Sequence, residues 1–283
     1  MTLADKFDTF LIDLDGVVYV GDSAVRGAPE AIKALRDAGK KVVFITNDPN
    51  KSSDGYAEKL ASMGVDALPG AVVTSVMAAR YYLRKYCEFK GKSAFIIGSR
   101  TMKREFESMG IALKEGTEAR NADFVIVGGH KEFNYEEMKN ASLAVQRGAQ
   151  FIATNRDPAY PTTEGLVPGT GAILASIETA SGKRARSVGK PGVIMFEAAL
   201  DAVDAPGNAV VIGDRLDSDI EGGKNVNLPT VLALSGATTK EDVNESEIKP
   251  DYIINSLADL ASTEIWEKNP LLSPDYTSPQ RKD

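Results

Sequence analysis

Short runs of apolar residues alternate with helix-length amphipathic segments along almost the whole chain of 283 residues. The runs are rich in Val, Ile and Phe without polar alternation, which is typical of parallel strands covered on both faces. The strands predicted on this basis are 9–13, 41–46, 93–98, 124–128, 150–154, 209–213, 230–234 and 252–254. The helices predicted between them are 29–38, 53–63, 135–147, 191–202 and 218–225. This alternation predicts an α/β fold with a doubly wound parallel sheet, whose chemistry lies at the carboxyl ends of the strands.

The polar motifs of the chain fall into two groups that flank a middle stretch with its own strand–helix alternation. We therefore predict that residues 83–184 form a second α/β domain inserted into the first, which comprises 1–82 and 185–263. Residues 264–283 are rich in Pro, Ser and charge and are predicted to be a poorly ordered C-terminal tail.

Composition excludes several classes of protein. With one histidine, His130, and one cysteine, Cys87, the chain cannot assemble a Cys/His zinc site or a disulfide framework, and a reducing compartment is expected. Its 40 acidic against 33 basic residues give a charge of −7, which argues against nucleic acid as a main partner. No stretch approaches the ~18 apolar residues of a membrane span, so we expect no membrane contact and a cytoplasmic protein. The plentiful potential ligands are oxygens, which suit magnesium.

Two carboxylates follow the first predicted strand, in Asp13-Leu14-Asp15-Gly16. Like charges this close repel unless a cation or a proton lies between them, so the pair is typical of a metal or acid–base site. The alternative is a simple turn after a strand, for which Asp15-Gly16 is also suited.

Small polar residues follow the second strand, in Thr46-Asn47-Asp48. Their hydroxyl, amide and backbone N–H groups are what the binding of a phosphate oxygen requires. The same residues are also good helix caps, and that alternative stays open.

A lysine and a further acidic cluster lie late in the chain. Pro191 is predicted to occupy the first turn of a helix, which places Lys190 before a helix N-terminus, where a nearby anion would explain it better than helix stability does. An ordinary solvated lysine is the alternative. Asp214 follows the strand 209–213, and Asp219 is predicted to point back from the opening turn of a helix, although a capped helix start would use the same residues.

Together these motifs describe a pocket with several acidic oxygens, neutral donors and one fixed positive charge. That combination predicts a phosphoryl group held against Mg²⁺. In order and spacing, the motifs at 13–16, 46–47, 189–191 and 213–220 resemble those of the haloacid dehalogenase (HAD) superfamily, specifically its NagD-like phosphatases. The middle stretch is similar to that family's C2-type cap, notably at 153–158 and 165–171. Asp48 departs from the pattern, because many members carry a second asparagine there.

The resemblance implies a Mg²⁺-dependent phosphatase that hydrolyses small-molecule phosphomonoesters through an aspartyl-phosphate. Sugar phosphates, nucleotides, glycerol phosphate, phosphoglycolate, pyridoxal phosphate and p-nitrophenyl phosphate are all compatible with the motifs. By the same resemblance Asp13 would be the nucleophile and Asp15 the acid and base. Asp13, Asp214 and the backbone carbonyl of Asp15 would hold Mg²⁺, with Asp219 supporting them from outside. Four further residues would contact or neutralise the phosphoryl group: Thr46, Asn47, Asp48 and Lys190.

The core motifs contact only the phosphoryl group, so the inserted stretch is expected to select the substrate. Asn155, Asp157 and Tyr160 lie in a loop after a predicted strand, and we expect one of them to contact the organic part of the substrate. Alternatively, Asn155 and Asp157 only cap a turn before Pro158. His130 is expected to be a loop residue, and the inserted stretch could support a homodimer.

Other functions stay open to different degrees. A phosphotransferase or phosphomutase on the same core would also use an acid–base Asp15. A receiver-like signalling protein that binds a phosphoryl group uses clustered aspartates too, but needs only one domain of about half this length. A dehalogenase needs no Mg²⁺ cluster, and a binding protein without turnover has no use for the intact Asp13/Asp15 pair.

Overall fold

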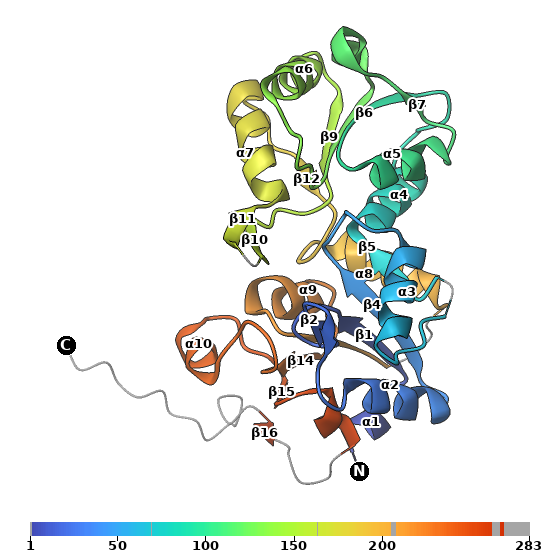
Figure 1. Ribbon diagram of the computed structural model, residues 1–283, viewed down its shortest axis with the longest axis vertical. Coiled ribbons are helices and arrows are strands. Elements are labelled where there is room, and N and C mark those ends of the chain that lie inside the picture. Colours follow the sequence, from blue (N-terminus) through green and yellow to red (C-terminus); the bar gives the residue numbers. More distant parts are fainter. Residues whose placement is uncertain (1, 69, 163, 205–207, 262–266, 269–283) are drawn as a thin grey trace, which may run out of the picture. The chain divides into compact units, whose positions relative to one another are not determined.

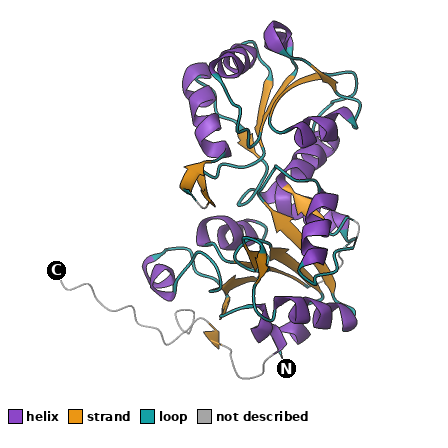
Figure 2. Cartoon of the chain, in the orientation of Figure 1, coloured by secondary structure: helices purple, strands orange, loops and turns teal. Residues whose placement is uncertain are grey.

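The computed structural model describes residues 2–68, 70–162, 164–204, 208–261 and 267–268 (Figures 1 and 2). The chain divides into two compact units. The first comprises Met1–Phe44, Leu60–Asp66 and Val203–Asp283, and the second comprises Ile45–Lys59 and Ala67–Ala202.

The first unit contains part of a mostly parallel sheet, with its strands in the order β16-β15-β14-β13-β1-β4. Strands β1, β13, β14 and β15 pair in parallel, and β16 pairs antiparallel with β15. The strands of this sheet are β1 (Thr9–Asp13), β4 (Lys41–Thr46), β13 (Ala209–Gly213), β14 (Thr230–Ala233), β15 (Tyr252–Ile254) and β16 (Glu267–Lys268). Every residue of β1 and β13 is buried, as expected for strands without polar alternation. The other elements of the unit are α1 (Leu3–Lys6), the hairpin β2 (Tyr19–Val20) and β3 (Ser23–Ala24), α2 (Ala28–Asp37), the π-helical turn η2 (Leu216–Ile220), α9 (Glu221–Asn225), α10 (Lys240–Glu245) and the 3-10 helix η3 (Leu257–Ala261).

The second unit contains a five-stranded parallel sheet with the order β12-β9-β8-β6-β7. Its strands are β6 (Ser93–Ile97), β7 (Ala112–Leu113), β8 (Phe124–Val127), β9 (Gln150–Ala153) and β12 (Arg186–Ser187). Helices α6 (Tyr135–Gln146) and α7 (Thr170–Ser181) cover one face of this sheet, while α4 (Ser75–Tyr86) and α5 (Arg100–Glu107) lie on the other (Figure 1). The remaining elements are β5 (Val72–Thr74), the 3-10 helix η1 (Gly116–Asn121), the antiparallel hairpin β10 (Ala159–Thr162) and β11 (Gly165–Pro168), and α8 (Val193–Ala202). Helix α3 (Ser53–Ser62) begins in this unit and ends in the first.

The predicted α/β fold with parallel sheets is confirmed, and all eight predicted strands are present with ends within one residue. The sequence pattern did not predict the short strands β5, β7 and β12, the β10–β11 hairpin or helices α4, α5, α7 and α10. The predicted tail lies outside the described residues except for β16. Within the described residues, no helix is long and apolar enough to cross a membrane.

The predicted start of the helix at Pro191 is wrong by two residues. The backbone N–H of Gly192 donates to the carbonyl of Gly189 at 2.8 Å, so a turn occupies 189–192 and α8 begins only at Val193. Lys190 therefore lies in a turn, not directly before a helix N-terminus. The predicted helix 218–225 is likewise divided into η2 and α9.

Candidate active site

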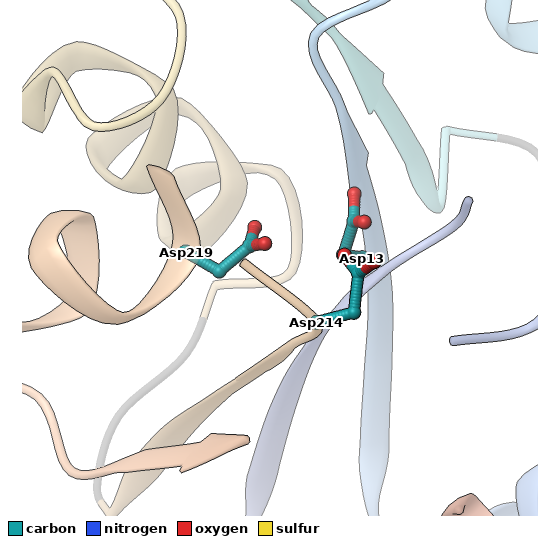
Figure 3. Close-up of side chains that lie close together, drawn as sticks. All are labelled: Asp13, Asp214 and Asp219. Atoms are coloured by element: carbon teal, nitrogen blue, oxygen red, sulfur yellow. The ribbon is translucent and has the colours of Figure 1, made fainter. Parts of the chain in front are cut away.

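Three buried carboxylates lie together at the carboxyl ends of β1 and β13. Parallel pairing places Ile12 beside Ile212, so the ends of the two strands bring Asp13 and Asp214 to the same edge of the sheet. Asp219 reaches them from η2, with its carboxylate directed toward the other two (Figure 3). One ligand oxygen from each residue lies within 4.8 Å of those of the other two, and all three side chains are buried. We call Asp13, Asp214 and Asp219 the acidic triad.

Two glycines make room for the carboxylate of Asp214. A Cβ atom added to Gly16 or to Gly236 would collide with this carboxylate, and Gly16 also has a φ of +81°, which few other residues adopt. The backbone N–H of Ala237 donates to Asp214 Oδ2 at 2.7 Å, and Ser235 Oγ donates to the carbonyl of Gly16 at 2.7 Å. The loop after β14 therefore holds Asp214 in place. The sequence motifs did not single out this loop, although it too follows the end of a parallel strand.

The π-helical turn positions Asp219. Its Oδ2 accepts hydrogen bonds from the backbone N–H of Arg215 at 3.2 Å and from Ser218 Oγ at 3.3 Å. A Cβ atom on Gly213 would collide with the Asp219 side chain, so glycine at the end of β13 lets this carboxylate lie against the strand. Such π turns inside helices are frequent at functional sites. The geometry brings a carboxylate oxygen of Asp219 within 4.8 Å of those of Asp13 and Asp214, whereas the family resemblance implied only a supporting position for it.

Asp15 has a different environment from Asp13. Asp13 is 6% exposed, whereas Asp15 is an exposed residue whose carboxylate accepts a hydrogen bond from Tyr19 Oη at 3.3 Å. One aspartate of the pair is thus fixed beside the acidic triad, and the other is accessible to solvent. The two have suitable environments for different chemical roles.

In the second unit, the side chain of Asn47 joins three loops. Its Nδ2 donates to the carbonyl of Lys190 at 3.1 Å and to Asp157 Oδ2 at 3.2 Å, while its Oδ1 accepts the backbone N–H of Lys190 at 2.8 Å. Asn47 and Lys190 are 9% and 5% exposed. Because the amide of Asn47 is fully engaged in these bonds, its side chain positions the Lys190 backbone and is not available to a ligand.

The backbone carbonyl of Asn47 is held as firmly as its side chain. It accepts hydrogen bonds from Asn155 Nδ2 at 2.6 Å and from Ser75 Oγ at 2.7 Å. Gly189 passes so close to this junction that an added Cβ would collide with the carbonyl of Thr154. Asn155 also accepts the backbone N–H of Asp157 at 3.1 Å, so both ends of its amide are engaged within the protein.

Asp48, where the sequence departs from the family pattern, bonds to its own loop. One oxygen of its carboxylate accepts the backbone N–H of Asn50 at 2.9 Å and Asn50 Nδ2 at 2.6 Å, and the other accepts Tyr56 Oη. Thr46 is buried, and its Oγ1 accepts the backbone N–H of Asp48 at 3.2 Å. The extra negative charge is therefore used to order the loop after β4.

The remaining predicted site residues lie apart from these hydrogen bonds. Tyr160 lies on β10 and is 36% exposed. His130 lies 3.2 Å from a carboxylate oxygen of Glu137, and its side chain is 15% exposed, so it is more enclosed than a simple loop residue.

A doubly wound sheet that ends in a buried acidic triad, with a second, exposed aspartate two residues after the first, is the arrangement expected of a phosphoryl-transferring hydrolase. Comparison with known families agrees. The profile of the family "Haloacid dehalogenase-like hydrolase" matches residues 10–112, and a HAD-hydrolase-like profile matches residues 187–260. The chain belongs to the haloacid dehalogenase-like hydrolase family and is one of its NagD-like phosphatases.

Three relatives show how far the similarity extends. The chain is 32% identical over 253 residues to an acid sugar phosphatase from Staphylococcus saprophyticus, covering 89% of this chain and 96% of the relative. The crystal structure of a glycerol phosphate phosphatase from Mycobacterium tuberculosis in complex with magnesium is 33% identical, with a TM-score of 0.85 and coverage of 92% of this chain and 78% of that one. A 4-nitrophenylphosphatase from Thermotoga maritima is 34% identical, with a TM-score of 0.84 and coverage of 92% and 98%.

Proposed function

We propose that this phosphatase is Mg²⁺-dependent and hydrolyses small phosphomonoesters, with sugar phosphates and glycerol phosphate as the first candidates. The observation that carries the proposal is the buried acidic triad at the carboxyl ends of β1 and β13. The substrate class follows from the relatives, which are named as acid sugar, glycerol phosphate and 4-nitrophenyl phosphatases.

The acidic triad fits a divalent cation. Three buried carboxylates within 4.8 Å of one another repel, and a hard cation with oxygen ligands relieves this repulsion. Asp13, Asp214 and the backbone carbonyl of Asp15 would hold Mg²⁺, with Asp219 as a supporting or direct fourth ligand. When bound, the cation would supply positive charge beside the phosphoryl oxygens.

The two aspartates of the first motif, Asp13 and Asp15, have different roles in the reaction. Asp13, fixed at the end of β1, attacks phosphorus and forms an aspartyl-phosphate. The exposed Asp15 protonates the leaving alkoxide and then removes a proton from the hydrolytic water. Support for this division is the contrast between a 6%-exposed Asp13 and an exposed Asp15.

Thr46 and Lys190 neutralise charge on the transferring oxygens. Lys190 carries the positive charge, and Thr46 supplies a hydroxyl at the end of β4. The loop 46–48 would offer backbone N–H groups to the phosphoryl group, since the side chains of Asn47 and Asp48 are engaged within the protein.

The five-stranded sheet and its helices act as the inserted specificity domain in this proposal. Asn155, Asp157 and Tyr160 are the proposed selectors of the organic part of the substrate. The exposed Tyr160 is the best placed of them to contact a ligand directly, while Asn155 would act by holding the loop. Dimerisation through this domain stays a prediction.

The test is a panel of phosphomonoesters incubated with purified protein and Mg²⁺, with released phosphate measured. At least one sugar phosphate or glycerol phosphate should be hydrolysed with a kcat/KM above that for p-nitrophenyl phosphate. Alanine variants of Asn155, Asp157 and Tyr160 should alter relative kcat/KM across the panel by about tenfold, as the loss of one hydrogen bond of ~1.4 kcal/mol would. An unchanged rank order and unchanged ratios in all three folded variants would exclude this loop as the selector.

A further inference from the structure

The five-stranded sheet of the second unit has a switch point between its neighbouring strands β6 and β8. The chain leaves β6 through α5 toward β7 on one side, and leaves β8 through α6 toward β9 on the other. Helices α5 and α6 lie on opposite faces of the sheet (Figure 1). In open parallel sheets, ligands bind outside the carboxyl ends of the strands at such a point, where the two connections diverge.

A pocket of about 840 Å³ lies at this switch point. Gly98 lines it from the end of β6, Leu113 from the end of β7, and His130 from the loop after β8. The volume is within the ~300–1,000 Å³ of small-molecule sites. None of the described residues that line it belongs to the acidic triad or to the loops joined by Asn47.

The lining restricts the ligand to a small polar molecule. Of the described residues that line the pocket, Leu113 is the only one with an apolar side chain. A lipid or an aromatic base would find almost no apolar surface to bury there. A metal ion is also a poor fit, because among the described residues the acidic triad is the only group of three potential ligands that approach within 4.8 Å.

Charges of both signs face the pocket, and part of them is already paired. Lys103 Nζ lies 2.8 Å from a carboxylate oxygen of Glu115. In contrast, Arg100 and Arg104, four residues apart on α5, make no ion pair within the described part of the chain. Like charges at this spacing are unfavourable on a helix unless an anion lies between them.

Three further carboxylates line the pocket. Glu107 lies at the end of α5, Glu118 follows β7 and Glu132 follows β8, and none of them has an ion pair to a described residue. Within the described part of the chain, two arginines on α5 therefore line the pocket without an ion pair, opposite Glu118 on η1 and Glu132 in the loop after β8.

We propose that this pocket binds a small zwitterion, of the class of free amino acids. Its carboxylate pairs with Arg100 and Arg104, and its ammonium group pairs with Glu118 and Glu132. The inference does not depend on the proposed function, because none of the described residues that line the pocket has a role in it.

The experiment is a titration of the full-length, ¹⁵N-labelled protein with L-amino acids, followed by the amide signals of Gly98 and His130, which line the pocket. A pool of the common L-amino acids is tested first and its members are then tested singly. Succinate and 1,4-diaminobutane are the controls that carry charge of one sign only. At least one amino acid should shift these signals saturably with a Kd of about 1 mM or lower, at least tenfold tighter than either control.

Matched variants locate the interaction. Arg104→Gln and Glu118→Gln should each weaken binding at least tenfold, whereas Arg84→Gln and Glu88→Gln, exposed residues in and after α4, should leave it within twofold. Absence of a saturable shift with every amino acid would overturn the proposal. So would equal binding of succinate or the diamine, or an equal loss of affinity in the two control variants.

Discussion

Removal of the Asn47 side chain should disable the phosphatase through Lys190. Asn47→Ala deletes three hydrogen bonds, two to the Lys190 backbone at 2.8 and 3.1 Å and one to Asp157 at 3.2 Å. The buried N–H of Lys190 then loses Asn47 Oδ1 as its acceptor, at a cost of ~1–3 kcal/mol. The hydrogen bond to the Asp157 carboxylate is lost as well. Together, these losses should lower the free energy of unfolding by about 2–4 kcal/mol, measured by denaturant titration.

The effect on catalysis follows from the position of the lysine. A shift of a catalytic group by ~1 Å can cost about a hundredfold in rate, so kcat/KM for p-nitrophenyl phosphate should fall about a hundredfold, or ~2.7 kcal/mol. Lys190→Met removes the ammonium group that Asn47 is proposed to position. In that background, Asn47→Ala should lower kcat/KM by less than about fivefold.

A matched control lies in the same loop. Asn50 is exposed and its side-chain amide donates to Asp48 in its own loop, so Asn50→Ala should keep kcat/KM within about threefold of the parent. If Asn47→Ala cost a hundredfold in both backgrounds, the two residues would act independently. The positioning role would then be refuted.

Four further predictions concern the metal, the acid, the glycine beside the acidic triad and the pH dependence of stability. EDTA should abolish phosphate release and excess Mg²⁺ should restore it, whereas full activity in chelator would contradict the metal assignment. Asp15→Asn should slow the hydrolysis of an alkyl phosphate at least tenfold more than that of p-nitrophenyl phosphate, because the better leaving group needs less protonation. If rapid-quench kinetics showed an equal decrease in the rate of phosphoenzyme formation for both substrates, the acid role would be wrong. Gly236→Ala should raise the Mg²⁺ concentration needed for half-maximal activity at least tenfold, since its Cβ would displace the Asp214 carboxylate; an unchanged requirement would show that this contact is unimportant. Hydrogen bonds from the backbone and side chain of Ser93 lower the pKa of Asp123 to about 2. The ionised carboxylate therefore contributes stability above pH ~4, and this contribution is lost as the pH falls from ~4 to ~2. In Asp123→Asn, the free energy of unfolding should decrease less steeply over that range during acid denaturation.

The strands and the acidic residues were predictable because both depend on local patterns. β1 and β13 are continuous apolar runs, and the rule that chemistry lies at the carboxyl ends of parallel strands is sufficient to single out Asp13 and Asp214. The same rule, applied to β14, would have drawn attention to Gly236. Its role depends on contact with a carboxylate 22 residues earlier, which no local pattern reveals.

The hydrogen bonds of Asn47 could not be predicted for a related reason. They join residues 110 and 143 positions apart, and the sequence motif alone is equally compatible with a phosphate ligand and a helix cap. At Pro191, in contrast, a local pattern predicted a helix start that the structure does not have. A proline suits the first turn of a helix, but the turn closed by Gly189 and Gly192 precedes α8 and displaces the helix start to Val193.

Detection of a phosphoenzyme on Asp13 would test the proposed mechanism at its first chemical step. The protein is mixed with a ³²P-labelled phosphomonoester and Mg²⁺, quenched with acid within milliseconds, digested and mapped by mass spectrometry. We expect a hydroxylamine-sensitive label on the peptide that contains Asp13, up to one equivalent per chain, and no label in Asp13→Asn. Turnover without any labelled aspartate, together with retained activity in Asp13→Asn, would contradict an aspartyl-phosphate mechanism.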